Sequence, residues 1–191
     1  MATQKEDFKC PNCKKKNRIK IKREVTSKDI DKIIDRSLFK VKCLACGETV
    51  TVDYPIKVVD KDFVIYYTPC SSAEIEDEFH EYMRVCDTFD DFKEKLLIMQ
   101  DSLNDVIIEL TKDYLVSTLD EKIKKEIRDI RYDGNNAEHL IFYLIGANQS
   151  VGCNKEIYQK LLKKFKIKKI QKCVNIDHQT YRKYLKKRLL K

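Results

Sequence analysis

The chain has 191 residues, of which 42% are hydrophobic and 37% are charged. This balance predicts a folded protein with a heavily charged surface and excludes a disordered tail. No apolar run approaches the roughly 20 residues of a membrane-spanning helix, and the first ten residues lack the apolar stretch of a secretory signal. We therefore expect a cytoplasmic protein with no membrane partner, whose eight cysteines stay reduced.

The net charge of +8 is distributed unevenly along the chain. Residues 1–60 carry 15 Lys or Arg against 9 Asp or Glu, residues 61–152 carry 10 against 20, and residues 153–191 carry 14 against 2. The three segments therefore have charges of +6, −10 and +12. The two basic ends favour either an anionic partner or pairing with the acidic middle segment, within the fold or in a dimer.

Four cysteines form two CxxC pairs, Cys10-Pro11-Asn12-Cys13 and Cys43-Leu44-Ala45-Cys46-Gly47. A gap of two residues lets one tight turn place both sulfurs on the same ion, and two such turns complete the tetrahedral thiolate set of structural zinc. Gly47 stands where the chain often leaves such a turn with positive φ, and Lys14 stands at the matching place of the first pair. We predict one structural Zn²⁺ bound by Cys10, Cys13, Cys43 and Cys46.

Two other interpretations of these cysteines remain open. They could be buried free thiols, or one pair could be a redox dithiol. Redox motifs of the thioredoxin kind open a helix in a βαβ unit, whereas the segments that flank both pairs have the alternating pattern of strands. The zinc interpretation is therefore favoured.

The segment around the two pairs predicts a zinc ribbon over residues 8–54. Strands are expected over residues 18–24, 39–42 and 48–54. Between the pairs, residues 27–35 predict a short helix capped by Ser27, with Ile30, Ile33 and Ile34 on one face. So small a sheet buries little apolar area, so the metal should supply most of its stability, about 10–16 kcal/mol in zinc-finger peptides.

Further along, residues 55–60 and 63–67 predict a hairpin around Lys61-Asp62, and residues 70–81 an acidic surface connection. Thr88 opens a helical pattern with Asp91 as its capping partner. Ser102 and Asp105 repeat that capping pattern, so we expect two helices that meet near Asp101 rather than one long helix. Their apolar stripe is most simply core.

The C-terminal part predicts a second hairpin and basic helices. Residues 126–132 and 138–145 flank Asp133-Gly134-Asn135-Asn136, a strong turn signal, although residues 122–130 also fit a helix. Helices are expected over residues 155–165 and 177–190, the second capped by Asp177, with a strand over residues 167–176 between them.

Together these elements predict an α+β protein, in which antiparallel zinc-ribbon strands and β-hairpins pack with several amphipathic helices. We divide it into residues 1–116, which hold the ribbon, the first hairpin and the helical segment, and residues 117–191. The second part holds the later hairpin and the basic helices and either forms its own region or continues the same domain.

The residues resemble the CpXC domain family. Cys10-Pro11-Asn12-Cys13 fits the Cys-Pro-x-Cys motif literally, and Cys43 to Gly47 is similar to the second motif with Leu44 at the usual proline. Similar segments follow over residues 8–115: Tyr54-Pro55, Arg84-Val85, Glu94-Lys95-Leu96, and Leu103-Asn104-Asp105 with Glu109 and Lys112, where Asn104 replaces a usual aspartate. The resemblance implies a zinc-ribbon-like domain of uncharacterised role.

Two classes of function compete. The first is a non-enzymatic binding or adaptor module for an unidentified protein partner. The second is a nucleic-acid-binding protein that neutralises phosphates with its basic regions. The candidate contact residues lie in both basic ends of the chain: Lys14, Lys15, Lys16, Arg18, Lys163, Lys164, Arg182, Lys186 and Arg188. The alternative is that these side chains are simply solvated. The sequence leaves the oligomeric state open.

We expect no catalytic residues and no cofactor beyond zinc. A catalytic zinc keeps an open position for water, and four cysteines leave none. Cys153, Cys173 and His178 match no standard ligand spacing, and Cys70 and Cys86 are interpreted as ordinary thiols.

Overall fold

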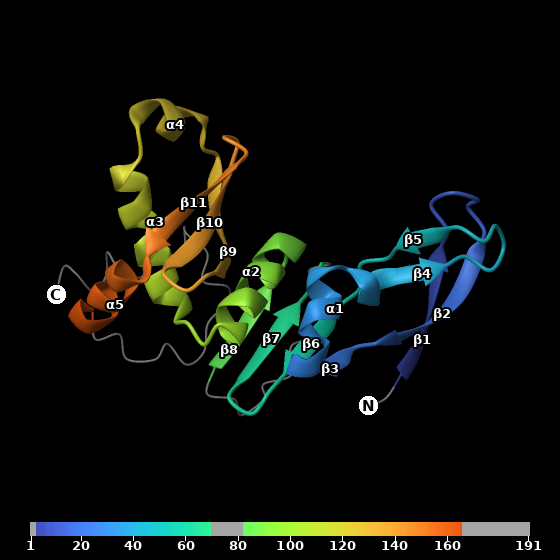
Figure 1. Ribbon diagram of the computed structural model, residues 1–191. Helices are drawn as coiled ribbons and strands as arrows, with labels where there is room; N and C mark the ends of the chain where they lie inside the picture. The colour runs from blue at the N-terminus through green and yellow to red at the C-terminus, as the bar shows by residue number, and fades with distance from the viewer. Residues whose placement is uncertain (1–2, 70–81, 166–191) are drawn as a thin grey trace. The chain divides into compact units, whose positions relative to one another are not determined.

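The computed structural model describes residues 3–69 and 82–165, which form mixed α and β structure as predicted (Figure 1). The chain divides into two compact units, Met1–Lys93 and Glu94–Lys191. Three predicted segments lie outside the described residues: the acidic connection over residues 70–81, the strand over residues 167–176 and the helix over residues 177–190.

The first unit contains two antiparallel hairpins, and each turns at one CxxC pair (Figure 1). Strand β1 (Thr3–Lys9) pairs with β2 (Lys16–Lys22), and β4 (Lys40–Lys42) pairs with β5 (Thr49–Thr51). The sequence analysis did not predict β1, because TQKEDFK is polar and carries a single apolar residue, Phe8. The two hairpins are the ribbon that the cysteine spacing predicts.

The segment between the hairpins corrects the prediction of one capped helix. Strand β3 (Glu24–Thr26) is followed by a 3₁₀ turn (Ser27–Asp29), helix α1 (Ile30–Ile34) and a second 3₁₀ turn (Ser37–Phe39). Ser27 caps neither helical turn, because its side chain is hydrogen-bonded to the carboxylate of Asp60. Ile30 and Ile33 are buried as expected, and Ile34 is partly buried.

A four-stranded sheet of order β3-β6-β7-β8 supports the hairpins. Strands β6 (Ile56–Val59) and β7 (Phe63–Tyr67) form the predicted hairpin around Lys61-Asp62, and β8 (Tyr82–Cys86) runs parallel to β7. The rings of Phe39, Tyr54, Tyr67, Phe89 and Phe92 pack at centroid distances of 5.1–6.5 Å. Because Phe39 immediately precedes β4, this aromatic cluster attaches the second hairpin to the sheet.

Two helices meet where the sequence predicts a break. Helix α2 (Phe89–Gln100) begins at the predicted capping pair: the Asp91 backbone N–H donates to Thr88 Oγ1 at 3.1 Å, and that hydroxyl donates to the Asp91 carboxylate at 2.7 Å. Helix α3 (Asp105–Thr118) is capped by Asn104 instead of Ser102. Asn104 Oδ1 accepts from the N–H groups of Val106 and Ile107, whereas Ser102 has a φ of 55° in the turn between the helices.

We expect Asn104→Ala to lower the free energy of unfolding by about 1–2 kcal/mol, because two N–H groups of the first turn lose their acceptor. Urea unfolding followed by circular dichroism measures this loss. Asn104→Asp keeps an acceptor oxygen at the same place and should cost much less. Equal losses in the two variants would contradict a capping role.

The second unit contains a three-stranded antiparallel sheet of order β11-β10-β9. Helix α4 (Glu121–Glu126), capped by Asp120, precedes β9 (Asp129–Asn135), β10 (His139–Ile145), β11 (Gln149–Asn154) and helix α5 (Lys155–Lys164). The predicted strand over residues 126–132 is thus correct only from Asp129 onward, and its first residue belongs to α4. Strand β11 was not predicted, because the apolar side chains of QSVGCN are few and short: Val151 and Cys153.

The second hairpin is confirmed, but its turn lies later than predicted. Asp133 to Asn135 continue β9, and the register shifts opposite Ile141 and Phe142, where Gly134 has a φ of 120°. The glycine therefore marks a bulge in the strand rather than the turn itself. The chain reverses after Asn136, whose Oδ1 accepts from the N–H groups of Glu138 and His139.

The core of the second unit is formed by the inward side chains of the sheet and by helix α3. Leu140, Phe142 and Leu144 of β10 are at most 1% exposed and pack with Ile107 and Tyr158. Among the helices of the described residues, none is long and apolar enough to cross a membrane.

Candidate metal centre

The two CxxC turns have the same backbone geometry. In the first, the Cys10 N–H donates to the Lys15 carbonyl and the Lys14 N–H donates to the Cys10 carbonyl. In the second, Cys43 and Gly47 make the equivalent bonds at 2.8 and 2.9 Å. Lys14 and Gly47 both have positive φ, 60° and 77°, as the predicted geometry requires. Because glycine adopts this region without strain, only the first turn carries a conformational cost.

The four cysteine sulfurs converge on one point, with all Sγ atoms within 4.8 Å of one another. The Sγ atoms of Cys10 and Cys46 are 3.9 Å apart, and those of Cys13 and Cys43 are 3.7 Å apart. A tetrahedral ion with Zn–S bonds of about 2.3 Å places its sulfurs about 3.8 Å apart, whereas a disulfide needs about 2.05 Å. The spacing therefore fits a shared metal ion and excludes disulfides between these pairs.

The environment of Cys43 favours its thiolate form. Burial alone acts to raise the pKa of its thiol, but hydrogen bonds from the backbone N–H groups of Cys46 and Ala45 outweigh burial and lower this pKa to about 6. Cys10 and Cys43 are buried, Cys13 is half-buried and Cys46 is exposed. The site can thus present an anionic sulfur ligand while one side stays close to solvent.

Asn17, which the sequence analysis did not single out, joins the two CxxC turns. Its side chain is 7% exposed, donates to the Lys15 carbonyl at 3.0 Å and accepts the Leu44 N–H at 2.9 Å. When protonated, the Cys43 thiol also donates to Asn17 Oδ1 at 3.4 Å. A polar residue among the alternating residues of β2 was the only signal in the sequence. Asn17 holds the two halves of the sulfur cluster in register.

We expect Asn17→Ala to weaken zinc retention by about 10- to 100-fold, the usual range for residues that orient metal ligands. Competition with a chromogenic chelator measures this affinity. Asn12→Ala is the matched control, since Asn12 also points an amide at a cluster sulfur, Cys46 Sγ at 3.9 Å, but does so on the exposed side. Equal losses in both variants would argue against the joining role of Asn17.

The predicted basic contact residues fall in different parts of the molecule. Lys14, Lys15, Lys16 and Arg18 are exposed on the first hairpin, at its turn and along β2. Lys163 and Lys164 are exposed at the end of α5, in the second unit. Arg182, Lys186 and Arg188 lie outside the described residues.

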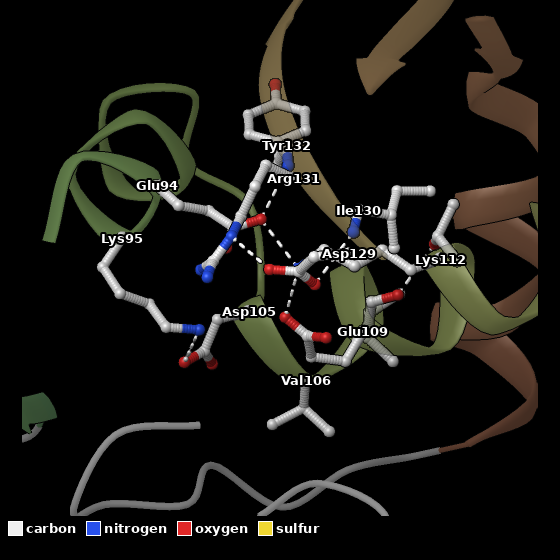
Figure 2. A network of polar contacts seen from close by, with 12 residues as sticks. Glu94, Lys95, Asp105, Val106, Glu109, Lys112, Asp129, Ile130, Arg131 and Tyr132 are labelled. Carbon is white, nitrogen blue, oxygen red and sulfur yellow. Dashed lines mark hydrogen bonds and ion pairs between the residues drawn. The ribbon is translucent and has the colours of Figure 1, made fainter. Parts of the chain in front are cut away.

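A second site is a network of buried charges in the second unit (Figure 2). The sequence analysis named Glu94, Glu109 and Lys112 through the family resemblance but gave them no role. Lys112 Nζ lies 2.7 Å from both Glu94 Oε1 and Glu109 Oε1, and these three side chains are at most 4% exposed. Glu94 Oε1 also accepts the Tyr132 backbone N–H at 2.6 Å. One carboxylate thereby connects α2, α3 and β9.

A separate ion pair lies near this cluster, and the cluster itself continues to Arg131. Lys95 and Asp105 form a buried pair at 3.4 Å, with side chains 2% and 1% exposed. Arg131 contacts Glu94 Oε2 at 3.3 Å and Asp129 at 2.8 Å, and its side chain is 24% exposed (Figure 2). The charged side chains therefore become more exposed from Glu94 to Arg131 and Asp129, from 4% to 24% and 37%.

The lysine at the centre of this network is charged. Burial acts to lower the pKa of Lys112, but the charges of Glu94 and Glu109 outweigh burial and raise the pKa well above its usual range. A buried ammonium ion held by two carboxylates is costly to remove, because both carboxylates then lose their shared cation in a low dielectric.

The remaining thiols in the described ranges are separate from the sulfur cluster. Cys86 and Cys153 are buried, and burial raises the pKa of the Cys153 thiol, which favours its neutral form. The sequence analysis disfavoured a second metal site of Cys153, Cys173 and His178. Cys173 and His178 lie outside the described residues. Within residues 3–69 and 82–165, one group of three or more ligand side chains converges, and it is the four-cysteine cluster.

The fold and the site define an α+β protein whose N-terminal ribbon carries a closed four-cysteine centre able to hold a metal ion. The family model of the CpXC protein matches residues 8–112, which is more than half of the chain. The chain belongs to the CpXC family, as its motifs indicate. No curated protein and no solved structure matches it.

Proposed function

We propose that this chain is a non-enzymatic nucleic-acid-binding protein whose N-terminal ribbon is organised by one structural Zn²⁺. The observation that carries the metal is the sulfur geometry, with Sγ distances of 3.7 and 3.9 Å within the set of Cys10, Cys13, Cys43 and Cys46. Four thiolates with soft donor atoms suit zinc better than a hard cation such as magnesium.

A structural rather than catalytic role follows from the closed ligand set. Zinc with four protein ligands keeps no position for a water molecule or a substrate atom, so it neither activates a nucleophile nor polarises a carbonyl. Its contribution is to hold two short hairpins in place. With three-residue strands β4 and β5, the second hairpin has too few pairs to be stable by itself.

The charge on the ribbon supports nucleic acid as the ligand. The exposed side chains of the first hairpin include Lys5, Lys9, Lys15, Lys16 and Lys20. Clustered exposed lysines neutralise phosphates and release bound counterions, which is the main source of affinity in binding without sequence preference.

A protein partner is the second candidate, and one observation favours it. Leu44 lies at the tip of the second CxxC turn and is 85% exposed, the largest exposure among the large apolar side chains of the described residues. Its backbone N–H is held by Asn17, so the side chain projects from a fixed position. Burying this exposed leucine against a partner would be favourable, by about 1.5–3 kcal/mol.

Two measurements on the purified full chain test the proposal. Metal analysis should find one zinc per chain. Fluorescence anisotropy with labelled DNA and RNA should find binding at about 50 mM salt that weakens steeply as salt rises. If no nucleic acid binds at that salt, this function is excluded, and a partner bound by wild type but lost in Leu44→Ser would establish the second candidate.

A further inference from the structure

The pairing of β1 with β2 sorts the residues of the first hairpin onto two faces. In an antiparallel pair, directly opposite residues and their i±2 neighbours lie on the same face. One face therefore combines alternate residues of both strands, and we name it the basic face: Thr3, Lys5, Asp7, Lys9, Lys16, Arg18, Lys20 and Lys22. The other face carries Gln4, Glu6, Phe8, Asn17, Ile19 and Ile21, of which all but Gln4 are buried or half-buried.

The basic face places like charges directly opposite one another. Lys5 is paired with Lys20, and Lys9 with Lys16. Six cationic side chains share this face with one carboxylate, Asp7, which is bound by Arg18 at 2.9 Å. Within the described part of the chain, none of the five lysines forms an ion pair.

Such pairing opposes formation of the hairpin, because like charges directly opposite in a sheet repel. A purely structural hairpin gains nothing from two such pairs on one face. An anionic ligand that lies along the face removes the repulsion. The opposed lysine pairs therefore indicate an anionic ligand more directly than the net charge of the segment does, because that net charge also counts side chains on the other face.

We propose that the basic face of the β1–β2 hairpin binds duplex DNA through its phosphates. This inference rests on the proposed function and names the nucleic acid and the surface. A two-stranded ribbon fits the major groove of B-DNA, about 12 Å wide, whereas the major groove of duplex RNA is deep and narrow. Seven residues per strand span about 24 Å, or about seven base-pair steps.

The composition of the face also distinguishes duplex from single-stranded DNA. Proteins that bind single strands stack bases on aromatic rings, and the basic face has no aromatic residue. Phe8 lies on the opposite face of the hairpin. Figure 1 shows the two strands, β1 and β2. Because five of its six cations are lysines, which act as point charges on phosphates, we expect affinity to vary little with base sequence.

The test measures the fluorescence anisotropy of three labelled probes as the zinc-loaded full chain is added. The probes are a 24-base-pair DNA duplex, one of its strands, and an RNA duplex of the same sequence. Six phosphate contacts predict a slope of about −5 for log affinity against log salt, and about a 10³-fold loss of affinity between 50 and 200 mM. Lys5, Lys9, Lys16 and Lys20 changed together to Gln should reduce this slope by about 4.

A matched control removes the same four charges elsewhere. Lys28, Lys61, Lys122 and Lys125 are exposed and lie off the basic face, so their joint change to Gln should leave the slope near that of wild type. Changing Lys5, Lys9, Lys16 and Lys20 together to Arg should keep the wild-type slope. Zinc content and circular dichroism verify that each variant is folded.

Four outcomes would overturn the inference. If both Gln variants lose the same amount of slope, the net charge of the chain and not the basic face determines DNA affinity. If the Arg variant fails to bind DNA, positive charge on the basic face is not what binds it. Tighter binding of the single strand or of duplex RNA than of duplex DNA would refute the named ligand while leaving nucleic-acid binding intact. Absence of binding to all three probes would refute the proposed function as well.

Discussion

Replacing Cys43 with serine should release the zinc and unfold the ribbon. Cys43 is fully buried, its Sγ lies 3.7 Å from that of Cys13, and a hydroxyl group cannot replace its thiolate on the ion. The lost binding free energy, about 10–16 kcal/mol in zinc-finger peptides, exceeds what strands of three residues recover by packing. The measured zinc content should fall from one ion per chain to none, and hydrogen exchange should show unprotected backbone over the two hairpins, Thr3–Lys22 and Lys40–Thr51.

The control for this experiment is Cys86→Ser, which also changes a fully buried thiol of the first unit. It should keep the zinc, because Cys86 does not belong to the sulfur cluster. Cys10→Ser should behave like Cys43→Ser, while the helical second unit keeps much of its circular dichroism signal. Unchanged zinc content in the Cys10 and Cys43 variants would contradict the metal centre.

Replacing Lys112 with methionine should have the second largest effect, a loss of about 3–5 kcal/mol of unfolding free energy. Methionine fills most of the same volume but leaves Glu94 and Glu109 as buried carboxylates without their shared cation. Chemical unfolding of the full chain, followed in the second unit by hydrogen exchange, measures the loss. Changing both glutamates to glutamine in the same variant should recover part of it, because the buried negative charges that lost this cation are removed.

Lys124→Met provides a matched comparison. Lys124 also pairs with a glutamate three residues earlier on a helix, Glu121 at 2.8 Å, but that glutamate side chain is 79% exposed. Pairs of this kind contribute about 0.5 kcal/mol or less. If Lys112→Met costs no more than Lys124→Met, the buried network does not hold α2, α3 and β9 together.

The errors in the predicted caps and in the predicted turn share one physical cause. A cap depends on which side chain reaches the free N–H groups, and this is decided by partners that are distant in the chain. Ser27 bonds to Asp60 and is lost as a cap, while Asn104, three residues before Ile107, replaces the expected Ser102. Gly134 similarly carries a turn signal but serves a bulge, because the register with β10 continues past it.

The sequence by itself determined the four-cysteine cluster, the family, the α+β class and the two-helix segment. The local patterns behind them depend on short spacings: Cys10 and Cys13 are three positions apart, as are Thr88 and Asp91. Tertiary structure alone decided which charges are buried and which face solvent. Glu94 and Glu121 have the same carboxylate, yet their side chains are 4% and 79% exposed. Strand register likewise placed Lys5 opposite Lys20, since hydrogen-bonded pairing, not proximity in sequence, determines which residues share a face.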